Sequence, residues 1–339
     1  MPLSTSLFSI GVPWKAARLL GVAVATWAVG ALYTVRANPE IAFFRRCAAV
    51  KQLWAQKLDL EYTNKVVFCG GSSCTTSVDG ERMLSQHRLP ALNLGLGAGM
   101  GAKVLTHYAQ DSVRTGDTLV VALEPDLLAG PLRIESLGAQ FGLSIGEPSL
   151  LRDPNRVDWL SALLDLRPGG YHTFTLVTKV VLRRPLYPYF AAELHPSGWH
   201  EVGARRAVKS VKEAPTKLSK EGRSWLVALH DWCDQRNVRV AYALPWGYSS
   251  PEDLKRFQGC NLRFLYEVAA TMPVLKDPNL GADTNLEHFA DTPFHPTAQG
   301  AALRTDELAR EIKPWTIWTR DELDERLKAI PLDPSQSPR

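Results

Sequence analysis

The chain has 339 residues, of which 45% are hydrophobic and 22% are charged, and its formal net charge is +4. These values are typical of a globular protein and argue against a disordered chain or a polytopic membrane protein. The positive charges occur only as short, scattered pairs, which argues against the concentrated basic surface of a nucleic-acid-binding protein.

Near the N-terminus, an uncharged run extends from Leu19 to Val35 between the basic residues Arg18 and Arg36. As a helix it would be about 25 Å long, slightly short of a bilayer core of about 30 Å. We expect residues 1–37 to form a single-pass membrane anchor or signal-anchor, followed by a helical connector over 38–64. A cleaved signal peptide and a buried helix are the alternatives.

Five short apolar runs, separated by helical patterns, follow from Lys65 onward and are typical of buried strands. They are KVVFCG (65–70), ALNLGL (91–96), TLVVAL (118–123), VRVAYALP (238–245) and MPVLKD (272–277). This alternation predicts an α/β fold with a doubly wound, flavodoxin-like, mostly parallel five-stranded sheet.

We expect this α/β domain to span residues 65–320, with a helical insertion at about 127–236 and a C-terminal tail over 321–339. Aromatic residues in the insertion could stack on a sugar, although such side chains more often pack: Tyr187, Tyr189, Phe190 and Trp199. The five cysteines show no CxxC spacing, so no metal site is expected and buried thiols are favoured. Cys233 and Cys260 could pair in an oxidising compartment.

Ligands of such sheets bind outside the carboxyl ends of the strands, which directs attention to the segments that follow them. The stretch GLGAGMG after the second strand lacks the GxGxxG and GK[ST] patterns, so we do not expect nucleotide binding. The stretch GGSSCTTSVDG after the first strand is either the site of a nucleophilic serine or an ordinary turn.

A serine nucleophile needs a base, and the base needs a group that orients it. In the segment HFADTPFHPTAQG, Asp291 precedes His295 by four positions at the boundary between a loop and a helix. A carboxylate in this position can hold the imidazole tautomer and stabilise the imidazolium. By itself, His295 could equally be a capping or surface histidine.

Three segments together resemble the SGNH/GDSL hydrolase superfamily: VVFCGGSSCTTSVDG, ALNLGLGAG and DTPFHPTAQGAALRT. They are similar to the first, second and last blocks of the membrane-associated branch, whose members act on acyl groups of envelope polysaccharides and teichoic acids. The resemblance covers residues 65–126 and 238–312, and leaves the insertion unexplained.

The resemblance implies a role for each matching residue. Ser72 stands seven positions before Asp79, as in the family pattern GGSNxxxGID, and is the implied nucleophile. An alignment of Gly71-Ser72-Ser73 with the family's Gly-Asp-Ser would instead select Ser73. His295 matches the base and Asp291 its orienting group, although the family spacing is three residues rather than four.

The resemblance implies that the backbone amide of Gly95 and that of the nucleophile itself donate to the oxyanion, and the side chain of Asn93 could add a further donor. The third block departs from the family, because Glu124, Pro125 and Asp126 stand where many members carry a donating asparagine. An ionised carboxylate cannot donate, and one missing donor costs roughly 10²- to 10³-fold in turnover.

The resemblance implies a serine esterase or O-acyltransferase that acts on acyl groups of a cell-envelope carbohydrate without a metal or cofactor. The expected partners are a carbohydrate or acyl-ester substrate, the membrane and a membrane-bound acyl-donor protein, but no nucleic acid. The catalytic domain is expected to be extracytoplasmic or periplasmic. A catalytically inactive platform protein in envelope polysaccharide assembly is the alternative, and a doubly wound domain with an unrelated ligand is a third.

Overall fold

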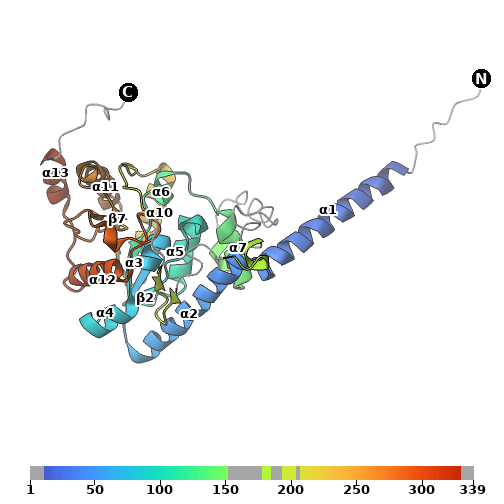
Figure 1. The fold of residues 1–339 in the computed structure, drawn as a ribbon, viewed down its shortest axis with the longest axis horizontal. Helices are drawn as coiled ribbons and strands as arrows, with labels where there is room; N and C mark the ends of the chain where they lie inside the picture. Colours follow the sequence, from blue (N-terminus) through green and yellow to red (C-terminus); the bar gives the residue numbers. More distant parts are fainter. Residues whose placement is uncertain (1–10, 152–177, 185–192, 204–206, 330–339) are drawn as a thin grey trace, which may run out of the picture.

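The computed structural model describes residues 11–151, 178–184, 193–203 and 207–329 (Figure 1). Its helices are α1 (Gly11–Arg36), α2 (Pro39–Glu61), α3 (Ser72–Ser77), α4 (Gly80–His87), α5 (Ala102–Gln110), α6 (Asp126–Ala129), α7 (Ser136–Ser144), α10 (Lys220–Asp234), α11 (Leu254–Ala269), α12 (Ala298–Ile312) and α13 (Arg320–Ala329). The short 3₁₀ helices are η1 (Ala98–Met100), η2 (Pro148–Leu151) and η4 (Leu286–His288). The strands are β1 (Val66–Gly70), β2 (Ala91–Asn93), β3 (Thr118–Ala122), β4 (Glu193–Leu194), β5 (His200–Glu201), β6 (Arg239–Tyr242), β7 (Gly247–Tyr248) and β8 (Ala282–Asp283).

Four of the predicted strands form one parallel sheet in the order β2-β1-β3-β6. The fifth predicted strand, MPVLKD (272–277), is not formed as a strand, because only Val274 makes a parallel bridge, to Tyr242. The neighbouring residues contribute two hydrogen bonds, from Tyr242 N to the Pro273 carbonyl and from Leu275 N to the Tyr242 carbonyl. Pro273 has no N–H to donate, which limits the ladder at this edge.

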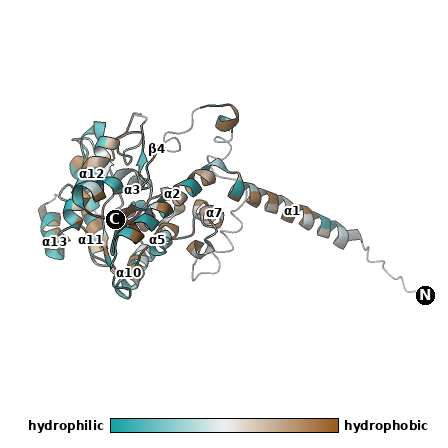
Figure 2. Ribbon diagram, turned by 90° about the horizontal axis from the view of Figure 1, so that it is seen from below, coloured by the Kyte–Doolittle hydropathy of each residue, from teal (hydrophilic) through white to brown (hydrophobic). Residues whose placement is uncertain are grey.

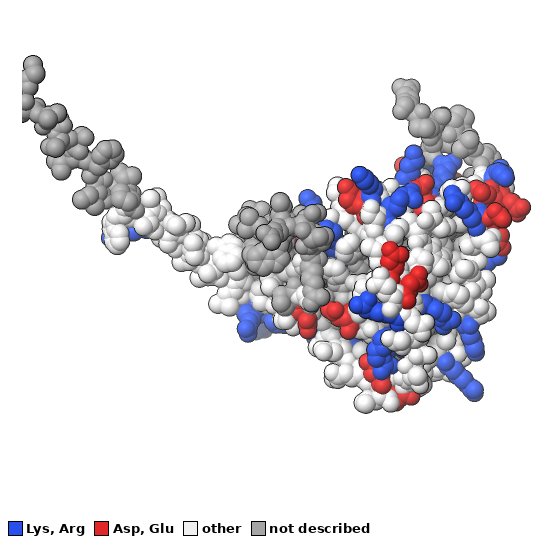
Figure 3. Space-filling model, turned by 180° about the vertical axis from the view of Figure 1, so that it is seen from behind, with Lys and Arg blue, Asp and Glu red and all other residues white. Residues whose placement is uncertain are grey.

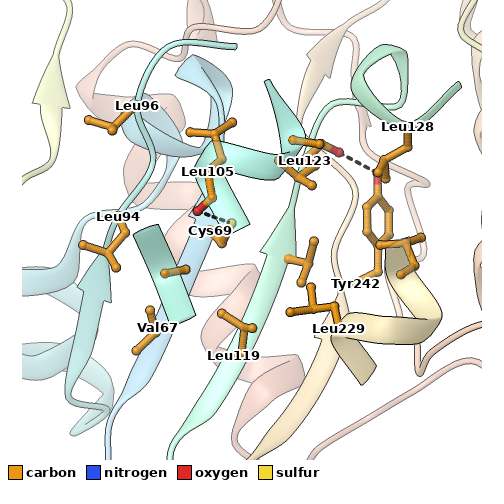
Figure 4. Close-up of a cluster of buried hydrophobic side chains, with 14 of the residues drawn as sticks. Val67, Cys69, Leu94, Leu96, Leu105, Leu119, Leu123, Leu128, Leu229 and Tyr242 are labelled. Carbon is orange, nitrogen blue, oxygen red and sulfur yellow. Dashed lines mark hydrogen bonds between the residues drawn. The ribbon is translucent and has the colours of Figure 1, made fainter. Parts of the chain in front are cut away.

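Helices cover both faces of this sheet, because alternate strand residues point to opposite sides. Val67, Leu119 and Tyr242 point into a cluster with side chains of α2, α5, α10 and α11. Figure 4 shows part of this cluster, including the hydrogen bonds from Cys69 Sγ to the Leu105 carbonyl and from the Tyr242 hydroxyl to the Leu123 carbonyl. Residues of the other register, such as Phe68 and Val120, pack with α3, α4 and α12.

Several segments assigned to a connector, an insertion or a tail belong to the core of the fold. Helix α2 lies in the predicted connector, yet Phe44, Cys47 and Leu58 on it are at most 2% exposed and pack in the main cluster. Helix α10 lies at the end of the predicted insertion and leads directly into β6. Helix α13 occupies the predicted tail and buries Leu323.

The N-terminal helix α1 projects from the globular body (Figure 1). Over Trp14–Arg36 it is long and apolar enough to cross a membrane, and only 6% of its most apolar stretch is buried. Many residues along its projecting part are hydrophobic (Figure 2). Their side chains are exposed, with Leu19 72% exposed. Figure 3 shows charges of both signs scattered over the globular body, whereas most of the described part of α1 is uncharged.

The side-chain expectations for the cysteines and for Trp199 can also be compared with the structure. All five cysteines are buried free thiols, so Cys233 and Cys260 do not pair. Trp199 is 6% exposed and donates from Nε1 to the Thr76 carbonyl, so it packs and is not presented to a ligand. The other three aromatics of the insertion, Tyr187, Tyr189 and Phe190, lie outside the described residues.

Candidate active site

The junction between β1 and α3 is shaped by two glycines. A Cβ atom on Gly70 would lie 2.4 Å from the Ala122 carbonyl oxygen and 2.5 Å from the Cys74 Cβ. A Cβ atom on Gly71 would lie 2.3 Å from Oε2 of Glu124. Neither position has room for a side chain, so only glycine allows the close packing at this turn. The turn from β1 into α3 brings Ser72 to the carboxyl edge of the sheet.

The two candidate serines have different surroundings. Ser73 is 1% exposed, and its hydroxyl donates to Glu124 Oε1 at 2.7 Å. Ser72, the first residue of α3, is partly exposed, and its hydroxyl makes no hydrogen bond within the described part of the chain. Ser72 is therefore the more available nucleophile, and there is no direct hydrogen bond between it and His295.

His295 and Asp291 lie in contact in a tight loop before α12. His295 Nδ1 is 2.8 Å from Asp291 Oδ1, and both side chains are at most 10% exposed. Two backbone bonds close the loop, from Ala290 N to the His295 carbonyl and from His295 N to the Thr292 carbonyl. The spacing of four residues therefore brings the Asp291 carboxylate onto Nδ1 of the imidazole ring.

Helix α12 brings this loop to the helix that begins with Ser72. The Thr305 hydroxyl on α12 donates to the Ser77 carbonyl at the end of α3 and accepts from Asp79 N. Thr297 caps α12 by accepting from Gly300 N, which places the start of α12 directly after His295. Segments more than 200 residues apart in sequence thus meet on one side of the sheet.

A second histidine–aspartate pair, which the sequence gave no reason to select, lies close by on β8 and η4. His288 Nδ1 is 2.5 Å from Asp283 Oδ2, and its Nε2 is 3.0 Å from Asn285 Nδ2. Its ring also stacks on Trp246. Both ring nitrogens of His288 therefore have a partner in this loop.

The predicted oxyanion donors bind to each other and to α3. Asn93 is fully buried, and its Nδ2 donates to the carbonyls of Cys74, Thr75 and Val78. Its Oδ1 accepts from Gly95 N at 2.9 Å. In this arrangement Asn93 anchors α3 to the sheet, and neither its amide group nor the Gly95 amide is available to an oxyanion.

A buried lysine of α2 and a buried histidine of the β4–β5 hairpin lie near the site. Lys51 is fully buried, and its ammonium group donates to the carbonyls of Asn93 and Gly198. His200 is 1% exposed, and burial together with the charges of Lys51 and His295 lowers its pKa well below the ordinary value. His200 is therefore neutral at physiological pH.

Within the described ranges, one group of side chains could hold a metal ion, on the same hairpin. The ligand atoms of Glu193, His195 and Glu201 lie within 4.8 Å of one another. His195 and Glu201 already form a hydrogen-bonded pair at 3.1 Å, and Glu193 is exposed. An exposed cluster of this kind is also an ordinary surface ion pair, and it does not include Ser72 or His295.

Comparison of the chain with protein-family models, with curated proteins and with solved structures gives no match. The functional interpretation therefore rests on the sequence motifs and on the geometry described above.

Proposed function

We propose that the protein is an SGNH-type serine esterase or O-acyltransferase that acts on acyl groups of a cell-envelope carbohydrate. In this proposal the Ser72 hydroxyl attacks the ester carbonyl while His295 takes its proton. His295 then returns the proton to the leaving alcohol, and the acyl group passes from Ser72 to water or to a sugar hydroxyl. Asp291 holds the imidazole and stabilises its charged form.

The observation that carries this proposal is the convergence of an unoccupied serine hydroxyl and a carboxylate-bound histidine. Ser72 lies at the start of α3, and the His295–Asp291 pair lies in the loop that leads into α12, which packs on α3. The absence of a direct hydrogen bond between Ser72 and His295 is compatible with catalysis, because such bonds are often long before substrate binds.

The finer features of the fold are part of the same proposal. The strand order and the bridge from Tyr242 to Val274 support a flavodoxin-like sheet in which Val274 marks a fifth strand position. The exposed apolar side chains of α1 support a single-pass anchor, with the catalytic domain on the extracytoplasmic side, close to a membrane-bound acyl donor.

One observation favours the alternative of an inactive platform protein in envelope polysaccharide assembly. Asn93 and Gly95, which the family resemblance assigns to the oxyanion, are bonded to each other. Without other donors, the tetrahedral intermediate would lack most of its electrostatic stabilisation.

A fluorophosphonate probe separates the two functions without knowledge of the natural substrate. An activated serine attacks the phosphorus atom and displaces fluoride, so the full-length protein in detergent should become labelled. Ser72→Ala should abolish labelling and His295→Ala should slow it by at least about 10²-fold, because the base is removed.

Ser73→Ala is the matched control for the serine. If Ser72 is the nucleophile, Ser73→Ala keeps a Ser72-dependent label, whereas Ser72→Ala loses it. Labelling that is absent, or that is the same in both serine variants, would overturn the hydrolase proposal and favour the platform protein.

A further inference from the structure

The exposed part of α1 is too short to cross a bilayer by itself. It runs from Trp14 to Val29, about 24 Å of helix at 1.5 Å per residue, whereas a hydrocarbon core is about 30 Å thick. In the next turns of α1, Gly30 and Thr34 are buried, and α1 contacts α7. If α1 spans the membrane, the end of the body from which it projects therefore lies against the headgroup layer.

A second exposed apolar segment, residues 178–184 (TKVVLRR), lies at this same end of the body. Its backbone forms one helical turn, closed by a hydrogen bond from Leu182 N to the Thr178 carbonyl. Val180, Val181 and Leu182 are 52%, 72% and 55% exposed. Both ribbon views place the segment level with α7 along the long axis of the molecule (Figure 1, Figure 2).

The charges at this end of the body are positive. Segment 178–184 contains no acidic residue, and Glu40, the only acidic residue in the range 36–46, is buried. Exposed or partly exposed basic side chains flank the apolar ones and also follow α1: Arg36, Arg46, Lys179, Arg183 and Arg184. Apolar side chains flanked by cations are typical of segments that lie in a membrane interface, because the cations bind anionic headgroups.

We propose that segment 178–184 is a second membrane contact. In it Val180, Val181 and Leu182 insert at the boundary between headgroups and acyl chains, while Arg183 and Arg184 bind phosphates of anionic lipids. This inference uses α1 as the anchor and is independent of the serine chemistry. It assigns the segment a role that a single helix cannot have, because two contacts fix how the body is oriented on the membrane.

The contact is weak without the anchor. Even a single buried acyl chain gives only marginal and reversible membrane binding, and three side chains bury less apolar surface than an acyl chain does. When α1 is inserted, the contact becomes intramolecular, and its effective concentration at the membrane is high. A chain that lacks the exposed part of α1 is therefore not retained on membranes by this segment.

A fluorescent probe on the segment tests the proposal in the full-length protein. The five native cysteines are buried, so Val181→Cys provides one accessible thiol for an environment-sensitive fluorophore. In vesicles of phosphatidylcholine and phosphatidylglycerol, its emission should shift to shorter wavelength, and spin-labelled lipids should quench it by at least about twofold. Leu303→Cys is the matched control, since this exposed apolar residue lies on α12, away from the α1 end of the body, and should not be quenched (Figure 1).

Two further pairs of substitutions, each made together with Val181→Cys, separate the apolar from the charged part of the contact. Val180→Ser with Leu182→Ser should reduce quenching in every vesicle, because less apolar surface is buried. Arg183→Glu with Arg184→Glu should reduce it in vesicles that contain phosphatidylglycerol and much less in pure phosphatidylcholine. Circular dichroism verifies that each variant is folded.

The outcomes distinguish the second contact from the anchor. Protein that floats with vesicles in high salt, but whose probe at position 181 is no more quenched than the probe at position 303, overturns the second contact alone and favours a protein partner for this surface. Quenching that neither pair of substitutions reduces also overturns it. Full-length protein that does not float with vesicles overturns both the contact and the anchor, whereas the serine-hydrolase proposal depends on fluorophosphonate labelling.

Discussion

Two histidine–aspartate pairs lie close together in sequence. His288 Nδ1 lies on Asp283 and its Nε2 on Asn285, and His295 Nδ1 lies on Asp291. We expect Asp291→Asn to slow labelling at Ser72 by at least about 10²-fold, because the wrong tautomer is then favoured. Asp283→Asn is the matched control and should change labelling by less than about twofold. Equal effects of the two substitutions would contradict the assignment of His295 as the base.

Lys51 predicts a pH dependence of stability. Its ammonium group is buried on two backbone carbonyls, and burial lowers its pKa from 10.5 to about 8. Between these pH values the unfolded chain holds a proton that the folded protein has released. The free energy of unfolding therefore rises with pH across this window, and below about pH 8 the full cost of charging the buried amine is present.

The variant Lys51→Met isolates this effect, because methionine has a similar length and does not titrate. The difference in unfolding free energy between wild type and Lys51→Met should grow in favour of the wild type from pH 8 to pH 10.5, by at most about 3 kcal/mol. Denaturant titrations at several pH values measure it. Parallel pH profiles for the two proteins would show that Lys51 does not change its protonation in this range.

The turn from β1 into α3 depends on Gly70 and Gly71, and we expect their substitution by alanine to have different effects. At Gly70 the new atom would meet backbone and a fixed side chain of the core, so Gly70→Ala should destabilise the fold by about 1–3 kcal/mol or more. At Gly71 the three nearest atoms all belong to the end of the Glu124 side chain, which can move more easily than backbone. Gly71→Ala should therefore cost less stability but slow labelling, because displacing Glu124 breaks its hydrogen bonds to Ser73, next to the proposed nucleophile.

Gly203→Ala is the control for both glycine substitutions, since a Cβ atom there would meet nothing within 4 Å. Thermal unfolding and labelling rates together test the distinction. A larger loss of stability in Gly71→Ala than in Gly70→Ala would contradict the described packing of the junction.

The strands could be predicted from the sequence because four of them are buried on both faces and appear as continuous apolar runs. A fifth strand over 272–277 is not confirmed, because Pro273 lacks a donor and the segment forms only isolated bridges, from Val274 to Tyr242 and from Leu275 to Ile317. Local composition also gave no sign that helices within the expected insertion and tail contribute to the core. Helices α10 and α13 join the core through contacts with distant segments, which local composition does not encode.

The three candidate residues could be selected from the sequence because each stands near the end of an element, where spacing and turn residues are informative. The environment of those residues could not be predicted. Asn93 and Gly95 lie at the expected strand end, but the Gly95 backbone N–H donates to the Asn93 side-chain oxygen. The bond between Glu124 and Ser73 joins two strand ends that only the completed sheet brings together.

At the scale of the whole molecule, helices α1 and α2 are consecutive but have opposite relations to the globular body. The projecting part of α1 exposes apolar side chains such as Leu20 and Val29, whereas α2 buries Ile41, Phe44 and Leu58. Apolar surface of the first kind is stable only in a membrane or against a partner. The buried apolar face of α2 belongs to the core, and removing α2 would expose the core residues that it covers.

Two truncations therefore have opposite expected outcomes. Without residues 1–29 the chain keeps the buried last turns of α1 and all of α2, so it should be soluble, folded and no longer sedimented with membranes. The full-length protein should resist extraction by high salt and dissolve in detergent. Removal of residues 1–61 should give an unfolded or aggregated product, because α2 supplies part of the main hydrophobic cluster. Salt extraction of the full-length chain without detergent, or a folded product lacking α2, would contradict this division between anchor and core.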